Sequence, residues 1–140
     1  MNPKLKQAVV KAGKALYKSL PVLLSVILLI SLINTLVPKS FYTTVFQKNI
    51  FLDSFIGSAL GSILAGNPVT SYILGGELLN QGISLIAVTA FLVAWVTVGL
   101  VQLPAESLLL GKKFAILRNI LSFVFAIFVA IITVLIIGVL

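Results

Sequence analysis

Residues 50–80, IFLDSFIGSALGSILAGNPVTSYILGGELLN, decide the fold. The stretch is largely apolar, but Gly66-Asn67-Pro68 divides it into two pieces. As one helix it would be roughly 45 Å long, which exceeds the hydrocarbon core of a bilayer. Because glycine and proline interrupt helices, we expect two helical pieces that meet inside a membrane, as a broken or re-entrant helical hairpin over residues 50–79.

The composition of the whole chain requires lipid as the solvent. Of its 140 residues, 60% are hydrophobic and 9% are charged, and the mean hydropathy is +1.22. A water-soluble domain of this size has too much surface to hide so much apolar area. Uncharged runs of 18, 21 and 22 residues, at 20–37, 83–103 and 119–140, are long enough to be spans. We predict an all-α membrane protein, a small transmembrane helix bundle in which residues 20–140 form one domain.

Prolines mark the expected ends of two spans. Pro21 suits the start of the first span, and Pro104 is expected to stop the span 83–103. Residues 1–19 carry five lysines, four of them near one face at helical spacing. We interpret this segment as a basic amphipathic interfacial helix, with a solvated tail as the alternative.

The basic residues also predict the topology. The lysines of residues 1–19 are expected to hold the N-terminus in the cytoplasm and against anionic lipid. If the region 50–79 returns to its side of entry, these five and the three basic residues of 104–118 share one side, against two in 38–49. If that region crosses fully, the basic residues on the two sides are equal in number, which is also the pattern of a chain that inserts in both orientations. The positive-inside rule favours three crossings, in a multi-pass protein of the cell membrane. Nucleic acid is not an expected partner, because no aromatic platform accompanies the charge.

The absence of cysteine and histidine excludes most catalytic chemistry. It removes disulfides, thiolate chemistry and nearly all transition-metal sites, and a hydroxyl nucleophile would lack its usual imidazole base. We therefore predict that the chain is not an enzyme and has neither a metal site nor a cofactor.

The interruption at residues 66–68 supplies candidate binding groups. Asn67 suits a helix cap and Pro68 the first helical position, and Thr70 and Ser71 add hydroxyls. A helix that begins here directs free N–H groups and a positive dipole end at the break. Irregular backbone at membrane depth is tolerated where protein buries it or a cavity adjoins it. We interpret these four residues as a substrate or ion site, with a turn at the membrane surface as the alternative.

The acidic residues of the chain are Asp53, Glu77 and Glu106. Each lies near the end of its element, where a carboxylate is often a solvated cap. Two glycines leave Glu77 sterically open, so we favour Glu77, together with Glu106, as a proton or cation site.

Small residues predict how the helices pack. Gly57, Gly61 and Ala65 stand four residues apart, a pattern that allows close approach of helices in lipid. Three short spans enclose little water, so we expect the solute path to lie between two copies of the chain, in a homodimer.

Four spaced stretches of this sequence carry a family resemblance: GNPVTSYILGGELL (66–79), AFLVAW (90–95), QLPAE (102–106) and LGKKFA (110–115). They resemble the predicted permease family that includes bacterial organoarsenical efflux permeases. The resemblance covers roughly residues 55–137 and implies one half of a full-length member, whose two related halves a dimer would rebuild.

The resemblance implies a half-size permease for secondary transport of a small solute or ion. The lack of cysteine argues against trivalent arsenic as that solute. The alternatives are a non-transporting membrane scaffold or accessory subunit, and a small channel.

Overall fold

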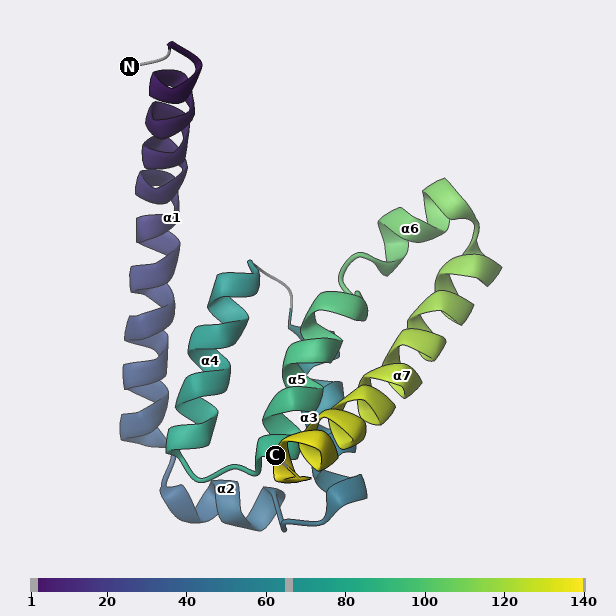
Figure 1. The fold of residues 1–140 in the computed structure, drawn as a ribbon. Coiled ribbons are helices and arrows are strands. Elements are labelled where there is room, and N and C mark those ends of the chain that lie inside the picture. The colour runs from purple at the N-terminus through teal and green to yellow at the C-terminus, as the bar shows by residue number, and fades with distance from the viewer. Residues whose placement is uncertain (1–2, 65–66, 140) are drawn as a thin grey trace. The chain divides into compact units, whose positions relative to one another are not determined.

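The computed structural model describes residues 3–64 and 67–139, and the regular structure of these residues is helical. Two helices, Lys4–Leu36 and Lys112–Gly138, are long and apolar enough to cross a membrane. The prediction of an all-α membrane protein is confirmed (Figure 1). The helices of the described residues are α1 (Pro3–Leu36), α2 (Lys39–Val45), α3 (Ile50–Ile63), α4 (Pro68–Asn80), α5 (Leu85–Thr97), α6 (Leu103–Leu110) and α7 (Lys112–Val139).

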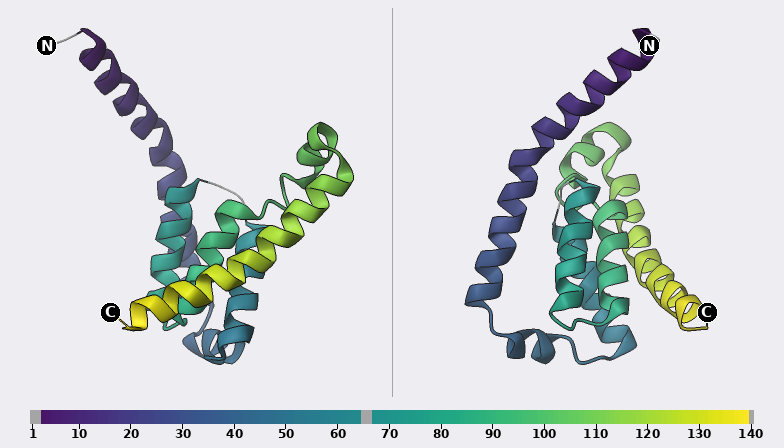
Figure 2. Two further views of the ribbon diagram at one scale, coloured as in Figure 1. Left: turned by 45° about the vertical axis from the view of Figure 1, so that its right-hand side comes forward. Right: turned by 60° about the vertical axis from the view of Figure 1, so that its left-hand side comes forward.

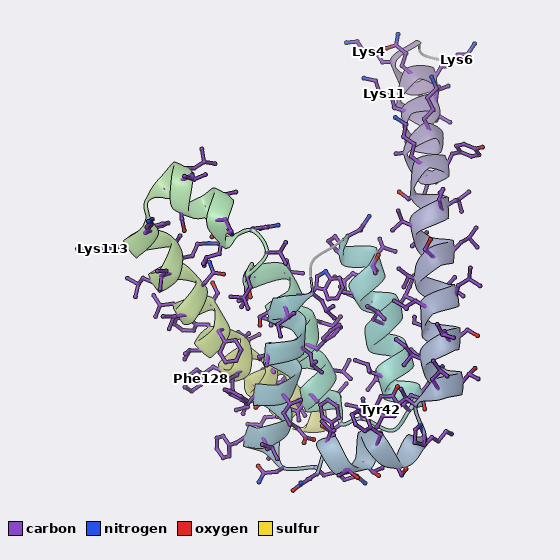
Figure 3. All side chains as sticks on the ribbon, turned by 180° about the vertical axis from the view of Figure 1, so that it is seen from behind. Lys4, Lys6, Lys11, Tyr42, Lys113 and Phe128 are labelled. Atoms are coloured by element: carbon purple, nitrogen blue, oxygen red, sulfur yellow. The ribbon has the colours of Figure 1, made fainter. Side chains whose placement is uncertain are left out.

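The chain divides into two compact units, the first ending at Val37 and the second beginning at Pro38. The first unit is α1, one helix of 34 residues that continues through Pro21, where the sequence suggested a helix start. A single proline removes only one N–H group from so long a helix, and helices in lipid tolerate it. Lys4, Lys6 and Lys11 lie at the N-terminal end of α1 (Figure 3), and their interfacial role remains a prediction.

In the second unit, α5 lies at the centre and α3, α4 and α7 pack on it (Figure 2). Ala90 and Ala94 of α5 are fully buried, and each belongs to a small core cluster with an alanine of α7, Ala130 and Ala126 respectively. Small side chains let helices approach closely where lipid supplies no hydrophobic driving force. These two contacts of α5 with α7 therefore depend on close approach of the helices.

The helix α5 is shorter than the continuous span 83–103 that the sequence suggested. It has 13 residues, about 20 Å of rise, and the backbone leaves the helix between Thr97 and Leu103. Pro104 lies in the first turn of α6 and does not stop the preceding helix. A proline is favourable in a first turn because the missing N–H has no partner there in any case. The last helix, α7, begins at Lys112, ahead of the expected start at Asn119.

Gly57 and Gly61 place α3 directly against the backbone of α5. A Cβ atom at Gly57 would lie 2.1 Å from the carbonyl oxygen of Ala87, and one at Gly61 would lie 2.3 Å from that of Phe91. Only glycine permits this contact. The glycine face is thus occupied inside the chain, and Ala65, the third residue of the predicted stripe, lies outside the described residues.

The predicted interruption of the region 50–79 is present, since α3 ends at Ile63 and α4 begins at Pro68. The two helices run in opposite directions, so that the start of α3 and the end of α4 lie at the same end of the second unit, where α2 also lies (Figures 1 and 2). The start of α7 lies at the opposite end, as the labels of Tyr42 and Lys113 show (Figure 3). The second unit therefore has one end at α2 and another at the α6–α7 connection.

Candidate functional site

The residues predicted to bind a solute form the first turn of α4. The Asn67 side chain caps the helix by accepting a hydrogen bond from the Val69 N–H at 2.9 Å, and Pro68 follows the cap. Ser71 is fully buried and donates its hydroxyl to the Pro68 carbonyl at 2.7 Å. Thr70 is also buried, but its hydroxyl has no hydrogen-bond partner among the described residues. Thr70 is therefore a buried side chain of this turn whose hydroxyl is available to a ligand.

Glu77 lies at the other end of α4, which places it about 13 Å from Pro68 along the helix axis. Its Oε1 atom accepts a hydrogen bond from the Gln81 amide at 2.9 Å, across the last turn of the helix. The structure therefore places Glu77 at the opposite end of α4 from Asn67, Thr70 and Ser71.

A second interruption, between α5 and α6, is held by a cluster of polar groups that we call the Glu106 cluster: Gly99, Glu106, Arg118 and Asn119. The Asn119 oxygen accepts from the Gly99 N–H at 2.8 Å, and its amide donates to Glu106 Oε2 at 3.0 Å. The other Glu106 oxygen pairs with the Arg118 guanidinium. Both carboxylate oxygens are thus paired, and the cluster joins the end of α5 to α6 and α7.

The two interruptions adjoin each other. A polar cavity of about 40 Å³ is lined by Ser62 and Leu64 from the end of α3, by Gly99 and Gln102 from the α5–α6 loop, and by Arg118 from α7. The sequence predicted the first interruption only. The sequence signal for the second interruption is the pair Gly99 and Pro104, at the end of an apolar run. We interpreted this pair as the end of a full-length span.

Asp53 is a polar residue whose environment in the structure differs from the one that the sequence predicts. It was interpreted as an interfacial acid near a helix end, yet its side chain is 0% exposed. The Ser84 hydroxyl, at the start of α5, donates a hydrogen bond to Asp53 Oδ2, and Oδ1 has no partner among the described residues. The available signal was spacing, because Asp53, Gly57 and Gly61 stand four residues apart and so share the face that packs on α5.

Beside the glycine face, α3 carries a second stripe that we call the serine row: Ser54, Ser58 and Ser62. Their exposed fractions are 0%, 0% and 4%. Ser54 and Ser62 bond to carbonyl groups of their own helix, as buried serines in helices commonly do. The Ser58 hydroxyl has no partner among the residues described. Within the second unit, one buried face of α3 therefore carries polar groups from Asp53 to the polar cavity.

The comparisons with known proteins agree with the resemblance seen in the sequence. The model of a family described as "Predicted permease" matches residues 4–138, which includes α1 as well as the helices of the second unit. No curated protein and no solved structure matches the chain. With nearly all of its length matched, the chain belongs to the predicted permease family.

Proposed function

We propose that the chain is a half-size permease that works as a homodimer in the cell membrane and moves a small solute or ion by secondary transport. Membership of a permease family supports membrane transport. The observation that carries the finer proposal is the meeting of two helix interruptions at one polar cavity, lined from α3, the α5–α6 loop and α7. Interrupted helices of this kind supply solute and ion sites in many secondary transporters.

The size of that cavity supports a second copy of the chain. A volume of about 40 Å³ has room for no more than a few water molecules. Larger open grooves of about 400 and 470 Å³ lie along α7, and their linings are almost entirely apolar, with Phe114, Leu121 and Phe125 in one and Ile120, Phe123 and Val124 in the other. A solute path needs a facing surface to close it, and a two-fold dimer supplies one from the same chain.

The proposed solute contacts lie around the first turn of α4, which is not among the segments that line the polar cavity. Thr70 brings a buried hydroxyl with free bonding capacity, and the turn that Asn67 caps presents the positive end of the helix dipole. Pro68 and Ser71 shape this turn. Glu77 and Glu106 are retained as proposed ion contacts, although each already accepts a hydrogen bond inside the chain.

The proposed topology has three crossings with a re-entrant hairpin of α3 and α4. It is supported by the return of α4 to the end of the unit where α3 begins (Figure 1). The two basic residues of 38–49 and those at the start of α7 would then lie on opposite sides of the membrane, with the larger group and the N-terminus in the cytoplasm.

Native mass spectrometry of the purified chain in lipid nanodiscs tests the assembly. A homodimer gives a protein mass of twice 14.9 kDa. A mass of one chain in every lipid composition would overturn the dimer.

Flux into proteoliposomes tests transport, with labelled phosphate, methylammonium and glycerol as the first anionic, cationic and neutral probes. We expect saturable uptake of an accepted probe, and Thr70→Val lowers it about tenfold, the size expected from one lost hydrogen bond. Thr43→Val is the matched control, because Thr43 is exposed on α2 and its hydroxyl bonds to the Ser40 carbonyl at 2.9 Å. Uptake that never saturates would identify a channel, and intact dimers without flux would identify a scaffold.

A further inference from the structure

Asp53 has the environment of a reversible proton site. It lies in the first turn of α3, is 0% exposed, and has one carboxylate oxygen without a partner among the described residues. Its one hydrogen bond comes from Ser84, 31 residues further along the chain. A helix cap at a membrane surface would be hydrated, so the burial of this carboxyl calls for another explanation.

The charges around Asp53 do not compensate it when it is ionised. Neither α5 nor α7 from Asn119 onward contains a charged residue. Lys48, at the same end of the unit, is exposed and lines a groove with Ser84, and no ion pair to Asp53 is present among the residues described. Glu77, on α4, accepts a hydrogen bond from Gln81. An ionised carboxylate buried in this way is costly, and binding a proton removes the charge.

The ionised form is nevertheless attainable. Asp53 lies at the N-terminal end of α3, and its partner Ser84 is the N-cap residue of α5, so two helix dipoles direct their positive ends toward the carboxyl. The Ser84 hydroxyl donates to the carboxylate and stabilises the charged form. A carboxyl group for which both the protonated and the ionised form are accessible can bind and release a proton.

Polar groups lead from Asp53 toward both ends of the unit. In one direction the serine row continues along α3, with about 6 Å of rise between successive hydroxyls, and ends at Ser62 in the polar cavity. Ser58, in the middle of the row, is 0% exposed and its hydroxyl is unpartnered among the described residues. In the other direction, Ser84 lines the groove of about 390 Å³ that also contains Lys48.

We infer that Asp53 is a proton-binding site, and that the serine row with intervening water connects it to the polar cavity. On release, the O–H bond of the carboxyl breaks, the proton passes to a water oxygen, and the carboxylate remains bonded to Ser84. On loading, the steps reverse, and no electron is transferred. Asp53 then carries the proton that drives the solute, and to this extent the inference rests on the proposed secondary transport.

Infrared spectroscopy of the chain in liposomes tests proton binding without any need for transport. We expect the C=O stretch of a protonated carboxyl to appear and disappear as the pH is changed, and Asp53→Asn to abolish that band. Isotope labelling of aspartate carboxyls, which marks Asp53 and no other residue of the sequence, is the matched control: it shifts the band, whereas labelling of glutamate carboxyls leaves the band in place. A band that persists in Asp53→Asn, or a wild type without one, would overturn the site.

A second variant keeps the test valid if Asp53→Asn does not fold. Ser84→Ala retains the carboxyl and removes its hydrogen-bond donor, so the frequency of the carboxyl C=O stretch is expected to differ from that of the wild type. An unchanged frequency in Ser84→Ala would contradict the inferred environment.

Proton entry into liposomes that contain pyranine tests the row. Ser58→Ala is expected to slow entry about tenfold, as for one lost hydrogen-bonding step. Ser25→Ala is the control, since that hydroxyl lies on α1 and bonds to the Pro21 carbonyl at 2.8 Å. Equal rates in both variants would overturn the relay. If solute uptake is the same in Asp53→Asn as in the wild type, this inference is wrong and the proposed permease function is retained. If the carboxyl band is present but no solute is taken up, the proposed permease function is wrong.

Discussion

Asp53 and Glu106 are both acids bonded to residues distant in sequence, yet their surroundings differ. Glu106 keeps 18% of its side chain exposed and has both oxygens paired, with Arg118 and Asn119. Asp53 has no exposed surface and one paired oxygen. Hydrogen bonds to both oxygens of a carboxylate offset its desolvation cost and can join helices. A buried carboxylate with one unpaired oxygen retains part of that cost, which a bound ligand can remove. The pairing of the oxygens therefore leaves Asp53 with more unmet hydrogen-bonding capacity than Glu106.

The largest expected effect comes from the contact that buries Asp53. Gly57→Ala puts a Cβ atom 2.1 Å from the Ala87 carbonyl oxygen, so α3 and α5 must separate. We expect a loss of about 3 kcal/mol of stability, or failure to fold, because backbone cannot yield as a side chain can. Titration with a denaturing detergent, followed by the fluorescence of the single tryptophan, Trp95, measures it.

Gly76→Ala is the control for Gly57→Ala, since nothing lies within 4 Å of a Cβ atom at Gly76. The same change there gains about 0.5 to 1 kcal/mol of helix propensity. Equal effects at the two glycines would contradict the close contact of α3 with α5.

The next effect comes from the Glu106 cluster. Asn119→Ala leaves the Gly99 N–H and Glu106 Oε2 without their partner, and Asn119 is 4% exposed. We expect a loss of about 2 kcal/mol in the same titration, the cost of buried groups left unpaired. Ser122→Ala, one turn further along α7, serves as the control. A loss below that of the control would mean that the cluster does not join the helices.

A smaller effect is expected when the outer partner of Glu106 is removed. Arg118 has 38% of its side chain exposed, so solvent screens its ion pair. Arg118→Ala is expected to cost less than about 1 kcal/mol, and the loss should shrink further in high salt. A salt-independent loss of several kcal/mol would show that the pair is more deeply buried than its exposure indicates.

The sequence predicted the interruption at Pro68 because glycine and proline coincide there with a helix cap, Asn67. It did not predict the interruption after Thr97, since Gly99 lies in an uncharged run and the bond that holds it comes from Asn119, twenty residues away. A helix interruption that neighbouring residues cause can be predicted from those residues. A break supported by a tertiary hydrogen bond has no such signal.

The acids illustrate the same limit. Glu77 and Glu106 stood out because their neighbours are polar or flexible, and both are engaged inside the chain. The burial of Asp53 depends on which helix lies against the face that it shares with Gly57 and Gly61. Spacing alone predicts that these residues share a face, and only the packing of α5 on that face makes the carboxyl a buried one.

The smallest expected effect on stability belongs to Asp53 itself. Asp53→Asn keeps the size of the side chain and an oxygen to accept from Ser84, and it removes a charge that lacks a counter-charge. The new amide N–H group replaces an oxygen that had no partner among the described residues, so one uncompensated polar group is exchanged for another. We expect a change within about 1 kcal/mol in the Trp95 titration, in either direction. An intact fold together with abolished proton uptake would show that Asp53 acts through its chemistry. A loss of stability as large as that of Asn119→Ala would instead identify Asp53 as a structural link between α3 and α5.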